Sequence, residues 1–161
     1  MRLRAIIAAA FALTLAAAGT CVAFDEDESP RNISYPVFPP APAMQTQEAA
    51  QAKTAGCMSC HTETDSATMH TSAGVNLGCT DCHGGNAGVM RAGVVQEGSK
   101  QYRDLQEKAH VQPRYPEAWN WPSSAKPKQS YTLLNREAPE FIRFVNPSDY
   151  RVARESCGRP K

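Results

Sequence analysis

The sequence predicts a mostly irregular chain with short α-helices. Twelve prolines and ten glycines are many for 161 residues, and they interrupt regular elements. No run of alternating apolar residues is long enough to predict a strand. The apolar fraction of 42% is inflated by an alanine-rich N-terminus, so the rest of the chain is short of large aliphatic and aromatic residues. We therefore expect something other than protein side chains to supply much of the buried apolar surface.

The N-terminus has the pattern of an export signal. Two arginines precede an uncharged, mostly apolar run over residues 5–19, and the small residues Cys21 and Ala23 lie at the positions that a signal peptidase recognises. The run is shorter than the ~20 residues that a membrane-spanning helix needs. We expect residues 1–23 to be a signal peptide and the protein to be periplasmic or secreted. Membrane association is expected only if Cys21 carries a lipid.

The rest of the chain divides into three segments. Residues 24–44 are acidic and then proline-rich, which predicts an extended tether. Residues 45–125 are predicted to form one domain around the motifs described next, and residues 126–161 a C-terminal helical segment. Local patterns predict helices over 45–55, stopping at Gly56, over 99–110, over 138–145, and over 148–156 after an Asn146-Pro147 N-cap.

A cluster of cysteines and histidines carries the chemistry. Residues 57–83 hold four of the six cysteines and three of the four histidines, arranged as two C-x-x-C-H motifs that lie 22 residues apart. C-x-x-C-H is the attachment signature of c-type haem, in which two thiols bond to the haem and the adjacent histidine binds its iron. We therefore expect two covalently attached haem c groups, which also supply apolar surface. The attachment residues are Cys57, Cys60 and His61 for the first haem and Cys79, Cys82 and His83 for the second.

Two other interpretations of the cysteines remain open. The spacing C-x2-C-x18-C-x2-C fits a four-cysteine zinc site, and a C-x-x-C pair can be a redox disulfide. A zinc site leaves both following histidines unexplained, and export exposes free thiolates to oxidation. A thioredoxin-like pair belongs in a strand–helix framework, which the segment between the motifs lacks. Haem attachment is therefore favoured over both.

Two haems have four axial positions, and the chain has four histidines. Haem iron in an electron carrier usually has both axial positions occupied by protein ligands. We therefore predict His70 and His110 as the distal ligands. The chain between the motifs is long enough for His70 to reach either haem, so the pairing stays open; we favour His110 on the first haem and His70 on the second. Met69 and Met90 are competing ligands. The alternatives are an exposed loop residue for His70 and a helix-end residue for His110.

Beyond the motifs, longer stretches of the chain resemble a known family. CMSCHTETDSATMH and GCTDCHGG, then AHVQPRYPEAW and SYTLLNREAPEFIRFVNPSDYRVARESCG, resemble the N-terminal part of large secreted bacterial multihaem cytochromes c over roughly residues 55–157. The resemblance implies a multihaem architecture packed around covalent bis-histidine haems. It also implies a further haem motif starting at Cys157, but Pro160 and Lys161 stand where its second cysteine and histidine would be. We therefore expect a chain truncated before that motif, continuing into or assembling with a larger multihaem protein.

The predicted function is electron transfer between redox partner proteins. Bis-histidine irons have no open position for a substrate, and the chain has no nucleophile–base constellation, so an electron carrier is favoured over a catalyst. Glu63, Asp65 and Asp81 are most simply solvated residues. One alternative is a fragment or subunit of a multihaem oxidoreductase with an open haem site; another is a haem-based sensor or assembly subunit. The near-neutral chain has no basic stripe that would bind nucleic acid.

Overall fold

The computed structural model describes residues 29–62, 76–115 and 134–157. Within these ranges the chain is helical or irregular and contains no strand, which confirms the predicted class of irregular chain with short helices. The predicted signal peptide with Cys21, and the candidate ligands Met69 and His70, lie outside the described residues. None of the described helices is long and apolar enough to cross a membrane.

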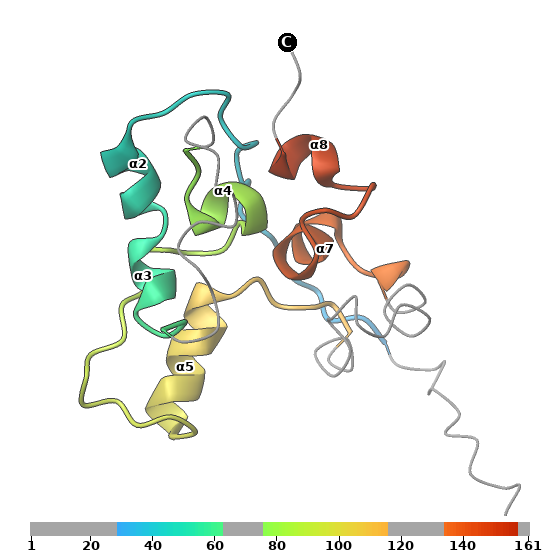
Figure 1. Cartoon of the computed structure of the whole chain (residues 1–161). Coiled ribbons are helices and arrows are strands. Elements are labelled where there is room, and N and C mark those ends of the chain that lie inside the picture. The colour runs from blue at the N-terminus through green and yellow to red at the C-terminus, as the bar shows by residue number, and fades with distance from the viewer. Residues whose placement is uncertain (1–28, 63–75, 116–133, 158–161) are drawn as a thin grey trace, which may run out of the picture.

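Six short helices make up the regular structure of the described ranges. In Figure 1, α2, α3 and α5 lie on one side and α7 and α8 on the other, with α4 between them. Helix α4 contacts both α7 and α8. On its other side, the backbone N–H of Thr80 donates to the Lys53 carbonyl at the end of α2, at 3.2 Å. The helices are α2 (Gln47–Ala52), α3 (Ala55–Met58), α4 (Cys79–His83), α5 (Lys100–Ala109), α7 (Pro139–Val145) and α8 (Ala153–Ser156).

Helices α5 and α7 lie where the sequence predicts them. The Ser99 hydroxyl accepts from the backbone N–H of Tyr102 at 3.1 Å, which caps the start of α5. The helix ends at His110, whose N–H donates to the Gln106 carbonyl. Pro139 occupies the first turn of α7, where its missing N–H costs nothing.

The prediction of one helix over residues 45–55 that stops at Gly56 was wrong, because the structure has two short helices there. Helix α2 ends at Lys53, and α3 runs through Gly56 instead of stopping there. Gly56 serves a close approach between chain segments: a Cβ at this position would clash with the carbonyl oxygens of Ala87 and Val89. Packing, not helix termination, therefore explains this glycine.

The helix predicted over residues 148–156 was also wrong in its start. Asn146 is not its N-cap, because the Asn146 N–H donates to the Ile142 carbonyl at 2.8 Å and closes α7. The chain then makes turns around Asp149, whose carboxylate accepts from the backbone N–H and the guanidinium of Arg151. Such side-chain bonds compete with helical ones, and α8 covers only Ala153–Ser156.

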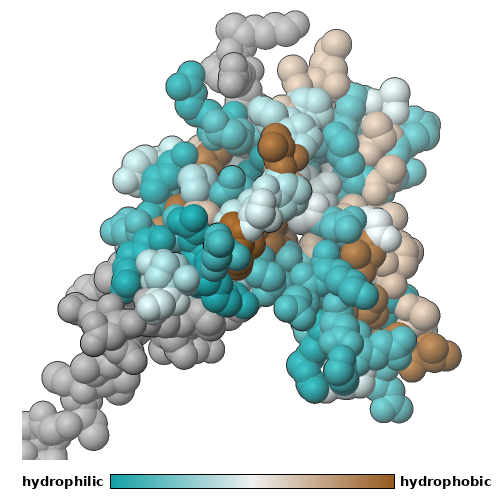
Figure 2. Space-filling view, turned by 180° about the vertical axis from the view of Figure 1, so that it is seen from behind, coloured by the Kyte–Doolittle hydropathy of each residue, from teal (hydrophilic) through white to brown (hydrophobic). Residues whose placement is uncertain are grey.

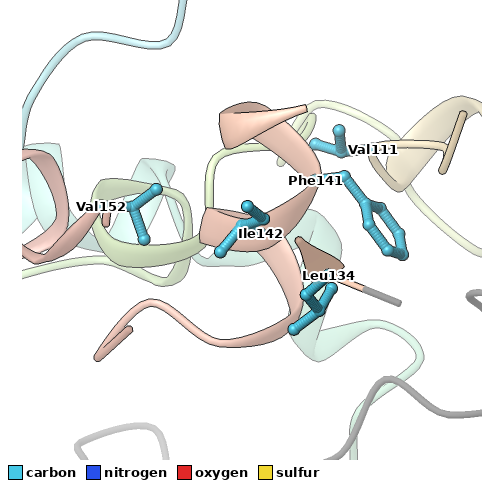
Figure 3. Close-up of a cluster of buried hydrophobic side chains, with 5 residues drawn as sticks. All are labelled: Val111, Leu134, Phe141, Ile142 and Val152. Atoms are coloured by element: carbon cyan, nitrogen blue, oxygen red, sulfur yellow. The ribbon is translucent and has the colours of Figure 1, made fainter. Parts of the chain in front are cut away.

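The hydrophobic core of the described residues is small and lies around α7 (Figure 3). No residue of α5 is buried, although this is the longest described helix. On the face shown in Figure 2, hydrophilic side chains predominate and hydrophobic ones are interspersed among them. The core cluster consists of Val111, Leu134, Phe141, Ile142 and Val152, with Tyr35, Phe38, Phe144 and Val145 packed against it.

Candidate haem sites

The second C-x-x-C-H motif forms a single turn of helix. Its five residues are helix α4, so Cys79 and Cys82, at i and i+3, lie on neighbouring positions of one face. His83, at i+4, lies beside Cys79 on that face. Gly84 follows in the left-handed region (φ +69°) and its N–H donates to the Thr80 carbonyl, which ends the helix. The motif thus brings two thiols and an imidazole together.

The first motif has a similar local geometry. The N–H groups of Cys60 and His61 both donate to the Cys57 carbonyl, at 3.1 and 2.9 Å, so the helical turn continues past the end of α3. The Ser59 hydroxyl donates to the Gly56 carbonyl and accepts from the backbone N–H of Arg91. These bonds fix the turn against the chain that follows the second motif.

The imidazole of His83 is oriented by a backbone carbonyl. Its Nδ1 lies 2.6 Å from the Phe144 carbonyl oxygen on α7. A carbonyl can only accept, so Nδ1 carries the proton and Nε2 is the nitrogen with a free lone pair. Metal-binding histidines usually donate their other ring N–H in this way, which fixes the tautomer and the ring orientation. His83 is therefore prepared to bind a metal through Nε2.

The structure brings His61 and His110 together from distant parts of the chain. Their ring centroids are 6.2 Å apart and their planes are inclined by 48°. Two imidazoles on opposite sides of one metal ion have centroids about 6 Å apart, because each metal–nitrogen bond is about 2 Å long. Burial lowers the pKa of His110, and the nearby His61 lowers it further, which favours the neutral ring that binds metals. This donor pair fits the two axial positions of one haem iron.

The two candidate sites lie next to each other. The Phe144 ring is 5.1 Å from the His110 ring and 6.4 Å from the His83 ring, measured between centroids. The half-buried thiols of Cys57 and Cys79 lie close enough for each to affect the pKa of the other: the neighbouring thiol raises the pKa of Cys57 and lowers the pKa of Cys79. Groups attached to the two motifs would therefore be neighbours.

Asp81, in the middle of the second motif, is buried, so the prediction that it is solvated was wrong. Its carboxylate accepts from Lys53 Nζ and Gln45 Nε2, both at 2.6 Å, and from the Gly78 N–H at 2.9 Å. Burial alone raises the pKa of Asp81, but the bonds from these groups outweigh it and lower the pKa. The bond from the Gly78 N–H to this carboxylate caps the start of α4.

Two other residues singled out from the sequence, Met90 and Cys157, are exposed. Met90 is 56% exposed. Cys157 is exposed and lies near enough to Cys82 to raise its pKa, after the larger effect of burial. Within the described ranges, no group of three or more His, Cys, Asp and Glu side chains is gathered closely enough to hold a metal ion. The four motif cysteines are thus not assembled into a zinc cage there.

Sequence reasoning missed Arg143, Phe144 and Lys53, which hold the second motif in place. Arg143 and Phe144 bind residues that lie 61 or 62 positions earlier, and no local pattern marks such a contact.

A comparison of the chain with protein-family models, curated proteins and solved structures finds no significant match.

Proposed function

We propose that the chain is an exported dihaem c-type cytochrome that carries electrons between redox partner proteins. A bound haem supplies one-electron chemistry at its iron, and the chain supplies ligands, orientation and surroundings. Each motif attaches one haem through its two thiols and provides one axial ligand through its histidine: Cys57, Cys60 and His61 for the first haem, and Cys79, Cys82 and His83 for the second.

The observation that carries this proposal is the arrangement of the two motif histidines. His83 has its Nδ1 proton held by a carbonyl, and His61 lies 6.2 Å from a second imidazole, that of His110. A four-cysteine zinc site or a pair of disulfides requires neither arrangement. A bis-histidine haem site uses both: an oriented proximal histidine and a second imidazole as the other axial ligand.

The same geometry supports one of the two distal ligands. We assign His110 to the first haem, opposite His61, because of the separation of the two rings. We assign His70 to the second haem; it lies outside the described residues, and its assignment rests on the count of four histidines for four axial positions. Two bis-histidine irons transfer electrons without binding a substrate.

Haem attachment is tested by expressing the full chain in a host with a c-type cytochrome maturation system. The pyridine haemochrome assay, set against protein concentration, should give two haems per chain. The paired variants Cys57→Ser with Cys60→Ser, and Cys79→Ser with Cys82→Ser, should each retain one. The matched control Cys157→Ser should retain two, because this cysteine belongs to neither motif.

The alternatives give different results in the same preparation. A chain without covalent haem in an active maturation host would contradict the proposal. The motif cysteines would then be better explained as zinc ligands or as disulfides. Two haems with a high-spin signal in the purified protein would indicate an open iron, and would favour part of a multihaem oxidoreductase over an electron carrier.

A further inference from the structure

The buried side chain of Arg143 contacts the backbone of the second motif. Arg143 is 4% exposed and lies on α7, which packs against α4. Its Nε donates to the Cys82 carbonyl at 3.0 Å, and its Nη2 to the Asp81 carbonyl at 2.6 Å. Hydrogen bonds from a charged donor are stronger than neutral ones, and a cation is favourable at the carbonyl end of a helix. Arg143 therefore fixes the end of the helix that carries His83.

The same guanidinium also holds the N-terminal extended segment against this helix. Nη1 donates to the Phe38 carbonyl at 3.3 Å and Nη2 to the Pro39 carbonyl at 2.9 Å. The Phe38 ring in turn lies close to Gly84, the residue after the motif. Arg143 thus joins segments that are more than 100 residues apart in sequence at the second site.

No carboxylate in the described part of the chain forms an ion pair with Arg143, whose hydrogen bonds all go to backbone carbonyls. Asp81 directs its carboxylate to Lys53 instead. Arg91, which lies beside the first motif, differs: its guanidinium is 2.9 Å from the carboxylate of Glu97, a residue whose side chain is 70% exposed. Glu155 and Asp81 act on the Arg143 charge from a distance without an ion pair. The second motif therefore has a buried arginine at its backbone with no direct carboxylate partner, whereas the arginine near the first motif is paired.

We propose that Arg143 is a positioning residue of the second haem site and that its buried charge makes the second haem easier to reduce than it would be without that charge. This inference rests on the proposed function. Reduction adds an electron at the iron, and a fixed positive charge nearby stabilises the reduced form. At an effective dielectric constant of about 20, a unit charge about 12 Å away changes such an equilibrium roughly tenfold.

The test measures the reduction potentials of the haem-loaded full chain by spectroelectrochemical titration. The wave of the second haem is identified by its loss in the chain that lacks Cys79 and Cys82. Two neutral variants, Arg143→Gln and Arg143→Met, remove the charge, and Arg143→Lys keeps the charge with fewer hydrogen bonds. Arg103→Gln is the matched control, because Arg103 is exposed on α5 and donates to the Gly98 carbonyl.

In the neutral variants, the reduced-to-oxidised ratio of the second haem at a fixed potential should fall about tenfold, which is 59 mV for a one-electron couple. Arg143→Lys should keep most of the potential but lower the unfolding temperature, and Arg103→Gln should change neither. The inference is overturned if the neutral variants keep the potential of the second haem. It is equally overturned if Arg143→Lys, the variant expected to fold most readily, loses as much potential as removal of the charge predicts.

The haem assay separates the two proposals. If the wild-type chain attaches no haem, the proposed function fails, and this inference fails with it. If it attaches two haems whose potentials do not respond to the charge at position 143, the proposed function stands and this inference alone fails.

Discussion

His110 lies at the end of helix α5, where the helix fixes its backbone and the surrounding rings fix its side chain. Its N–H donates to the Gln106 carbonyl, and its imidazole lies close to both the His61 imidazole and the Phe144 phenyl ring. A histidine at a helix end is ordinarily explained by the helix dipole, which favours the charged ring. Here burial and His61 lower the pKa of His110 and favour the neutral ring. The environment therefore suits a metal ligand better than a dipole-stabilising cation.

Replacing His110 with alanine should open one axial position of the first haem. We expect His110→Ala to convert one of two low-spin haems to a high-spin form, visible by optical and electron paramagnetic resonance spectroscopy of the loaded chain. Lys108→Ala, at an exposed position in the last turn of the same helix, should leave both haems low-spin. Two low-spin haems in His110→Ala would show that His110 is not a required ligand, and would direct attention to Met90.

Helices α3 and α4 are too short to be stable alone, and each is positioned by contacts with other segments. Helix α3 is placed by the close approach at Gly56, and α4 by Asp81 at its start and Arg143 at its end. Local sequence patterns predicted α5 and α7. They could not predict the boundary at Gly56, because the reason for that glycine is a neighbouring segment.

Adding a methyl group at Gly56 should displace the first motif. A Cβ there would clash with the carbonyls of Ala87 and Val89, so Gly56→Ala should destabilise the loaded chain by roughly 1–3 kcal/mol, as overpacking usually does. Gly93→Ala is the matched control, since a Cβ there would meet no atom within 4 Å. Chemical unfolding measures the difference between the two variants. Equal stability of both would mean that the close approach at Gly56 is easily relieved.

At the scale of the whole molecule, the sequence names the candidate ligands but not the contacts that bring them together. The proposed attachment residues come from two contiguous motifs, and the count of four histidines made His110 a candidate axial ligand. The contacts that assemble the sites join distant segments: Cys57 with Cys79, His61 with His110, and residues of α7 with α4. Such contacts depend on tertiary packing, which one sequence does not encode in any local pattern. Most of the small core that accompanies them lies around α7, and none of it lies in α5.

Because the core lies around α7 and not α5, we expect haem attachment to stabilise α5 more than α7. Helix α5 has no buried residue, whereas Phe141 and Ile142 of α7 are almost fully buried. If haem supplies the missing apolar surface, hydrogen exchange of the amides in α5 should slow markedly on haem loading, with a smaller change in α7. The comparison uses the loaded chain and the chain that lacks all four motif cysteines, both analysed by mass spectrometry. Equal protection of α5 in both would mean that protein contacts alone stabilise this helix, and that the two sites contribute chemistry without contributing to the fold.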